Sequence, residues 1–195
     1  AIMGPSGCGK TTLLNILSGI DEPTSGQVMV DEKSLFSVSD NERSRIRAQY
    51  LGFIFQDFNL LPVLSAVENV ELPLLLLGKS ATEARTTALE ALKSVGLGER
   101  SEHRPSELSG GQQQRVGIAR AIVHSPTVIL CDEPTGNLDS ATSQSVMKLL
   151  KTINEKIGTT FLLVTHDGEV AKQCSRVLRM EDGIIVSDER GQEEE

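Results

Sequence analysis

The stretch Gly4-Pro5-Ser6-Gly7-Cys8-Gly9-Lys10-Thr11-Thr12 decides the fold of this chain. It fits the pattern G-x-x-x-x-G-K-[ST], in which backbone N–H groups surround a polyphosphate. Glycine has no Cβ, so the backbone can turn tightly and approach the ligand closely. Apolar residues on one face of 13–17, followed by Gly19, predict a helix directly after the loop. The helix N-terminus would add positive partial charge, so 4–12 predicts a phosphate site between a strand and a helix.

Within this loop, two side chains have expected partners. Lys10 should reach the β- and γ-phosphates, and the Thr11 hydroxyl should bind Mg²⁺. Cys8 lies near Lys10 and the helix N-terminus, two features that favour a reactive thiol. The loop needs a buried strand in front of it, and only residues 1–3 are left to supply one, so the sequence looks cut at its front edge. The loop alone leaves open a kinase, a GTPase, a helicase or a transporter ATPase.

Composition excludes several classes of protein. The chain has 195 residues, 38% of them hydrophobic, enough for one sizeable globular unit. A net charge of −8 gives no basic footprint, so we expect no nucleic-acid partner. The longest strongly apolar run, 72–77, is far shorter than the ~20 residues of a membrane span. The three cysteines show no metal-ligand spacing, which favours reduced thiols.

Apolar strand patterns alternate with helical ones, which is typical of an α/β fold with a parallel sheet. We expect one domain, 1–195, in which 1–56 and 127–187 form the core. The range 57–126 should form a helical subdomain, and 188–195 a solvated acidic tail. Expected strands cover residues 26–30, 51–55, 127–131, 159–164, 176–180 and 184–187.

An acidic pair ends the apolar strand pattern of 128–131. Asp132 and Glu133 would lie in the crevice where α/β sheets hold their ligands. Asp132 could hold Mg²⁺, and Glu133 is placed to polarise an attacking water. Two carboxylates at a solvated strand end would be the plain alternative, which the phosphate loop makes less favourable.

A second donor-rich turn lies at 108–115, Leu-Ser-Gly-Gly-Gln-Gln-Gln-Arg. Ser109, Gly110 and Gly111 stand at the start of a predicted helix, which is itself an anion-binding arrangement. One chain with two phosphate-binding turns suggests that two chains share nucleotide.

The order of these motifs, with Gln56 and His166 added, resembles the ATP-binding cassette ATPase of ABC transporters. The resemblance extends to about Val186, and Ser-Gly-Gly-Gln is that family's signature. It implies a P-loop NTPase sheet flanked by helices, with an inserted helical subdomain and without most of the family's N-terminal antiparallel strands. It also implies ATP and Mg²⁺ as cofactors, a head-to-tail dimer of two copies, and a membrane permease that holds the subunit at the cytoplasmic face.

The resemblance also implies roles for individual residues. Gln56 would sense Mg²⁺ and the attacking water, and Glu133 would be the catalytic carboxylate. His166 would contact the γ-phosphate, and Asp139 would lie at the dimer seam. The signature residues that would bind the ATP of the partner chain are Ser109, Gly110, Gly111 and Gln112.

A finer resemblance points to the branch that handles lipoprotein release and macrolide efflux. The strings that carry it are 55–62, 68–74 and 132–139, although amino-acid importers share several of them. The family normally has about forty more residues before the loop, with an aromatic that stacks on adenine. We therefore expect a fragment of a longer chain, with weakened adenine recognition and an exposed sheet edge.

Two other functions stay open. A non-transport ABC ATPase usually shows duplicated cassettes or long coiled-coil insertions, whereas this chain has one cassette and a short middle segment. The other is a nucleotide-binding fragment that does not hydrolyse, and the presence of both Glu133 and His166 argues against it. Hydrolytic turnover with and without a permease would separate these possibilities.

Overall fold

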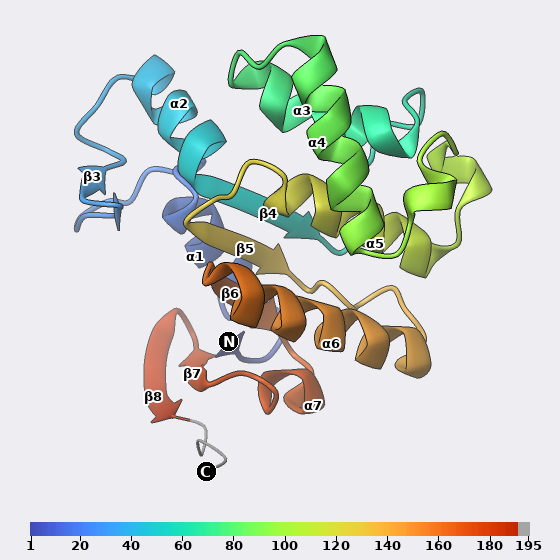
Figure 1. Ribbon diagram of the computed structural model, residues 1–195. Helices are drawn as coiled ribbons and strands as arrows, with labels where there is room; N and C mark the ends of the chain where they lie inside the picture. Colours follow the sequence, from blue (N-terminus) through green and yellow to red (C-terminus); the bar gives the residue numbers. More distant parts are fainter. Residues whose placement is uncertain (191–195) are drawn as a thin grey trace.

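A six-stranded sheet forms the centre of the molecule in a computed structural model that describes residues 1–190 (Figure 1). The strand order is β4-β5-β6-β1-β7-β8, with all neighbours parallel except the β7–β8 hairpin. The α/β prediction is therefore confirmed. The strands of this sheet are β1 (Ile2–Met3), β4 (Leu51–Phe55), β5 (Val128–Asp132), β6 (Thr160–Thr165), β7 (Arg176–Glu181) and β8 (Ile184–Arg190).

The two-residue strand β1 lies in the middle of the sheet. Ile2 pairs with Val164 of β6 on one side and with Leu178 of β7 on the other. Ile2 is 3% exposed, so the short segment before the loop does supply a buried strand. Neighbours on both sides fix where the phosphate loop leaves the sheet.

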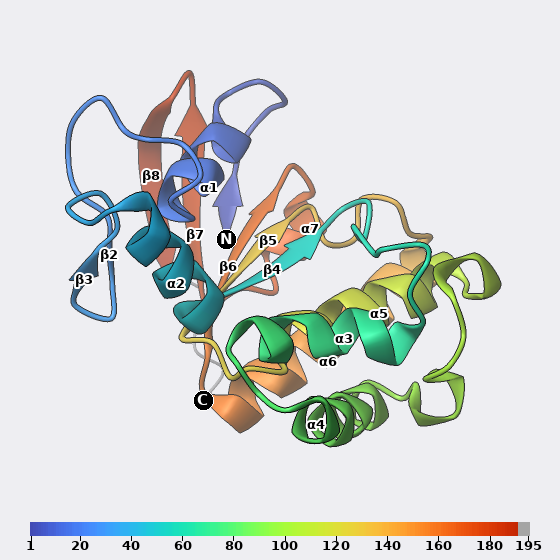
Figure 2. The same ribbon diagram turned by 90° about the horizontal axis from the view of Figure 1, so that it is seen from above.

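Helices cover both faces of the sheet (Figures 1 and 2). The Ser65 and Ser80 side chains each form a reciprocal capping box with the glutamate three residues later, which fixes the starts of α3 and α4. At Ser39 only one half of the box is present, the bond from the Glu42 N–H. The helices are α1 (Lys10–Leu17), α2 (Asp40–Tyr50), α3 (Ala66–Leu76), α4 (Ala81–Ser94), η1 (Gly98–Arg100), η2 (Pro105–Glu107), α5 (Gly110–Ile122), α6 (Ser140–Ile157) and α7 (Gly168–Ala171).

Alternation along β5 divides the interior into two hydrophobic clusters. Ile129 and Cys131 point to one face, where they pack with α3 to α6. Leu130 points to the other face, where it packs with the α1 and α2 side chains Leu14 and Ile46. Figure 2 shows the sheet between α1 and α2 on one side and α3 to α6 on the other.

Two expected boundaries differ from the structure. Of the predicted strand at 26–30, only β2 (Met29–Val30) forms, and it pairs antiparallel with β3 (Lys33–Ser34) in a separate hairpin. Its turn residues Asp31 and Glu32 both have positive φ, a hairpin signal that the alternation pattern does not contain.

The prediction also placed the start of the acidic tail too early in the sequence, at residue 188. Strand β8 pairs with β7 as far as Arg190, and Asp188 and Glu189 form ion pairs with arginines on β7. Residues 191–195 of that tail lie outside the described residues. Within 1–190, none of the helices has the length and apolar character needed to cross a bilayer.

Candidate nucleotide site

The phosphate loop joins the end of β1 to the first turn of α1. Gly7 and Gly9 have φ values of 81° and 98°, which side chains with a Cβ rarely adopt. Lys10 is only 6% exposed, and its Nζ donates hydrogen bonds of 2.8 Å to the carbonyls of Gly4 and Pro5. The ammonium group is thereby held inside the curve of the loop, where it can meet a polyphosphate.

Gly4 permits a close approach between the loop and the sheet. A Cβ at this position would lie 2.1 Å from the carbonyl oxygen of Met180 and 2.8 Å from the Cys8 sulfur. Cys8 itself is 4% exposed, so its burial opposes the reactivity expected from Lys10 and the helix N-terminus. Its side chain packs in the same hydrophobic cluster as Met180 and Leu14.

The carboxyl ends of β5 and β6 bring the predicted acid and histidine together. Glu133 has a φ of 44°, unusual for a residue with a Cβ, and its N–H donates to the Val164 carbonyl. This turn directs its carboxylate to His166, whose Nδ1 lies 2.7 Å from Oε1. Burial, with the Glu133 charge, raises the pKa of Asp132, while Lys10 acts in the opposite direction. Lys10 and Glu133 therefore both lie close enough to Asp132 for their charges to act on its carboxyl group.

Gln56 follows β4 and lies against the loop after Glu133. Its Nε2 donates to Asn137 Oδ1 at 3.1 Å. A Cβ on Gly136 would lie 3.0 Å from the Gln56 amide, so the glycine leaves room for this side chain. The Gln56 oxygen, the Asp132 carboxylate and the Thr11 hydroxyl are hard ligands of the kind that Mg²⁺ prefers. Within 1–190, no cluster of three acidic, histidine or cysteine side chains forms a complete metal cage.

The signature turn caps helix α5. The Ser109 hydroxyl accepts from the Gln112 N–H, and the Gln112 side chain accepts from the Ser109 N–H. A Cβ on Gly111 would lie 2.5 Å from the Thr142 methyl group, so this glycine allows α5 to pack on α6. Asp139 caps α6 by accepting hydrogen bonds from the backbone N–H of Thr142 and of the residue before it. The bond from the Thr142 hydroxyl, together with these backbone bonds, lowers the Asp139 pKa.

The structure does not bring the signature turn to the phosphate loop of the same chain. Leu14 of α1 packs in one hydrophobic cluster, while Val116 and Ile118 of α5 pack in the other, across the sheet. Because α5 leads back into β5, its first turn lies near the carboxyl edge of the sheet (Figure 2). Both turns therefore face the same edge from opposite sides of the sheet.

Sequence reasoning missed three polar residues that hold these segments together. Gln114 is fully buried on α5, and its amide donates to the Pro134 carbonyl. Arg120 donates to the carbonyls of Phe58 and the next residue, which both have positive φ. Asn137 binds Gln56, as described above. A glutamine inside an apolar helix face was the one visible signal, because such a group needs a partner when buried.

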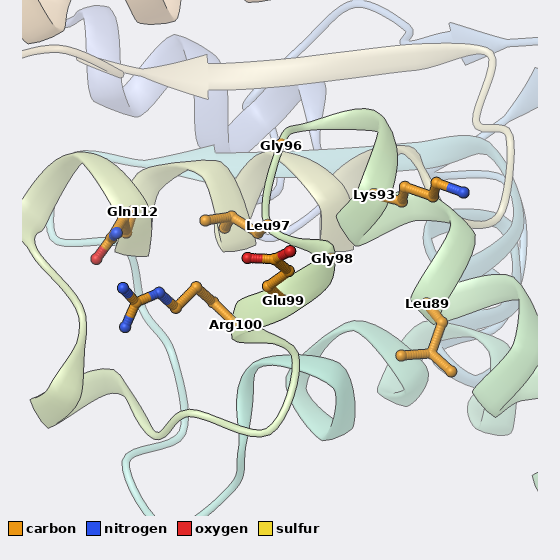
Figure 3. A pocket seen from close by; sticks show the side chains of 8 residues that line it. All are labelled: Leu89, Lys93, Gly96, Leu97, Gly98, Glu99, Arg100 and Gln112. Carbon is orange, nitrogen blue, oxygen red and sulfur yellow. The ribbon is translucent and has the colours of Figure 1, made fainter.

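Two surface hollows formed by residues 1–190 bear on the position of the site. One of about 180 Å³ adjoins the phosphate loop and includes Gly4, Pro5 and His166. A larger one, of about 620 Å³, lies between α4, η1 and the start of α5 (Figure 3). Of the predicted site residues it includes only Gln112, so this larger hollow is not the nucleotide site.

Comparison with known proteins identifies the family. A family model described as ABC transporter matches residues 1–136. The chain belongs to the ABC transporter family. The cassette is 51% identical over 185 residues to the ABC transporter ATP-binding protein MJ1508 of Methanocaldococcus jannaschii, covering 95% of this chain and 82% of that protein. It is 49% identical to MJ0796 of the same organism, covering 97% of this chain and 83% of the relative.

Solved structures agree with this assignment. The cassette superposes with a TM-score of 0.88, at 46% identity, on a dimeric post-hydrolysis state of MJ0796 bound to ADP and Pi. A second dimeric structure of MJ0796 gives the same TM-score at 47% identity. Each covers 98% of this chain and 84% of the matched one. The protein is thus the ATP-binding cassette of an ABC transporter, with the expected fold.

Proposed function

We propose that this cassette hydrolyses Mg·ATP and that Glu133 is the carboxylate that polarises the attacking water. The observation that carries the proposal is the 2.7 Å contact between Glu133 and His166 at the carboxyl ends of β5 and β6. This contact brings a carboxylate and an imidazole together at the sheet edge beside the phosphate loop, where a general base must lie to reach the attacking water. The matched relative, a cassette bound to ADP and Pi, supports the same chemistry.

The other site residues then have consistent roles. Residues 4–12 would surround the phosphates, and Lys10 would offset the charge that develops on them. His166 would pass from Glu133 to the γ-phosphate as nucleotide binds. Thr11, Asp132 and Gln56 would hold Mg²⁺, because all three offer oxygen ligands. When bound, the ion supplies charge neutralisation at the phosphate oxygens.

A second copy of the chain would complete the site. The signature residues 109–112 and the loop 4–12 face the sheet edge from opposite sides, so one chain cannot place both on a single nucleotide. A head-to-tail pair would place the Ser109–Gln112 turn of each copy over the ATP of the other. Asp139, already ordered as the cap of α6, would lie at the seam. The dimeric structures of MJ0796 support this arrangement.

We also infer a membrane permease as partner, which would hold the cassette at the cytoplasmic face. Leu76 at the end of α3 is 79% exposed, and Val63 before that helix is 73% exposed. Both follow Gln56, so an apolar docking surface there would connect the partner to the nucleotide site. The strings 55–62 and 132–139 favour the export and lipoprotein-release branch.

Phosphate release tests the hydrolytic role. Glu133→Gln keeps the shape of the side chain and removes the base, so turnover should fall by at least a hundredfold. The variant should also accumulate an ATP-bound dimer, seen by size-exclusion chromatography. Glu90→Gln, an exposed change on α4, is the matched control and should keep wild-type turnover. Undiminished turnover in Glu133→Gln would remove this residue from the role.

A further inference from the structure

Asn137 makes three hydrogen bonds, and all of them go to two adjacent residues far away in the sequence. Its Nδ2 donates to Asp57 Oδ1 at 2.6 Å and to the Gln56 carbonyl at 3.3 Å. Its Oδ1 accepts from Gln56 Nε2 at 3.1 Å. One side chain thus joins the segment after β4 to the loop after β5.

The chemistry of these partners fixes which way each amide faces. The Asp57 carboxylate and the Gln56 carbonyl can only accept, so the Asn137 NH₂ group must face them. The Asn137 oxygen is then left for the Gln56 side chain, which must present its own NH₂ group. The Gln56 Oε1 consequently faces away from Asn137, and it has no hydrogen-bond partner within 1–190.

Gly136 limits the Gln56 side chain from a second direction. A Cβ there would lie 3.0 Å from both Gln56 Cδ and Nε2, so the amide packs against bare backbone. In the loop after Glu133, Asn137 therefore contacts this amide through a hydrogen bond, and Gly136 contacts it through packing.

We propose that Asn137, oriented by Asp57, is a positioning residue that fixes the Gln56 amide with Oε1 free to bind Mg²⁺. This inference rests on the proposed Mg·ATP function and assigns Asn137 and Asp57 to it. Amide oxygens bind Mg²⁺ and amide NH₂ groups do not, so a reversed amide would place hydrogen atoms where a ligand is needed. The two bonds that Asn137 donates therefore determine which atom of the Gln56 amide is left for the metal ion.

Binding of a fluorescent, non-hydrolysable ATP analogue, titrated with Mg²⁺, tests this directly. Asn137→Ala should raise the Mg²⁺ concentration needed for tight binding about tenfold, as is typical when a residue that orients a metal ligand is lost. Affinity in EDTA should equal that of the wild type, because Asn137 does not touch the phosphate loop. Asn41→Ala, an exposed change on α2, is the matched control and should change neither value.

Double variants separate positioning from general stability. In a Gln56→Ala background, Asn137→Ala should add less than twofold, because its effect passes through Gln56. Asn137→Asp alone should also raise the Mg²⁺ concentration needed for tight binding, since two carboxylates then face each other. Adding Asp57→Asn supplies a donor and should recover part of the loss, which keeps the test decisive even if Asn137→Ala folds poorly.

Distinct results would overturn distinct claims. An unchanged Mg²⁺ requirement in Asn137→Ala, or an undiminished tenfold loss in the Gln56→Ala background, would overturn this inference alone. If the affinity of the wild-type cassette for the analogue did not change with Mg²⁺ concentration, the proposed Mg·ATP function would be overturned, and this inference with it.

Discussion

Gly4→Ala should destabilise the cassette and weaken nucleotide binding together. The added Cβ would lie 2.1 Å from the Met180 carbonyl oxygen and 2.8 Å from the Cys8 sulfur, far inside van der Waals contact. Because the Met180 oxygen is backbone at the end of β7, it cannot rotate away as a side chain could. The loop must instead move by about 1 Å, and such overpacking costs about 1–3 kcal/mol.

For a chain of this size, each kcal/mol lowers Tm by roughly 2–4 °C, so the expected drop is about 2–12 °C. The Gly4 carbonyl also accepts from Lys10 Nζ, so the displacement would move the ammonium group as well. Differential scanning calorimetry should give the change in Tm, and fluorescence titration with ATP should give the loss of affinity.

Gly98→Ala is the matched control. The three atoms nearest to a Cβ at Gly98 would all belong to Lys93, at 3.7 Å or more, so we expect a change within about 0.5 kcal/mol. If Gly4→Ala and Gly98→Ala had the same Tm and the same ATP affinity, the close approach of loop and sheet would not constrain the site. The reasoning about Gly4 would then be refuted.

Three further predictions concern charge, anchoring and packing. Burial raises the Asp132 pKa, so its ionised form weakens the fold and stability is lost as pH rises through that pKa. Asp132→Asn should therefore raise Tm at pH 7 and lose Mg²⁺-dependent binding, and the gain in Tm should vanish below about pH 4, as a pH series of melts would show. Arg120→Ala removes two bonds to backbone carbonyls and should cost about 1–3 kcal/mol in urea denaturation, where a cost below the error would contradict its anchoring role. Leu92→Ala, at a fully buried position, should cost about 2–5 kcal/mol by the same assay, whereas Leu89→Ala, 37% exposed, should cost much less.

Elements with strong local signals could be predicted from the sequence. Helices α3 and α4 begin after serines that are followed three residues later by glutamate, a local capping pattern, and β4 covers the predicted 51–55. Apolar runs also located β5 and β6 to within a residue. These elements are specified by residues close together in the chain, which is why a pattern is enough to find them.

Contacts between distant segments were not predictable in this way. The bonds from Asn137 to the residues after β4, and from Gln114 to the Pro134 carbonyl, depend on how loops meet in space. Periodicity carries no information about such meetings. The phosphate-loop and acidic residues were found because glycine and carboxylate spacing reflects the chemistry itself. The roles assigned to individual site residues stay predictions.

The central place of β1 has a consequence for biosynthesis. The ribosome makes Ile2 and Met3 long before the two strands that flank them, because β6 and β7 come from residues 160–181. These later residues must emerge before the phosphate loop gains its support. Most of the helices of 66–122, by contrast, pack on one another early, since their contacts are local. A nascent cassette would thus fold its signature helix well before its phosphate loop could bind a nucleotide. Stalled or shortened chains would therefore fold in part without binding cellular ATP.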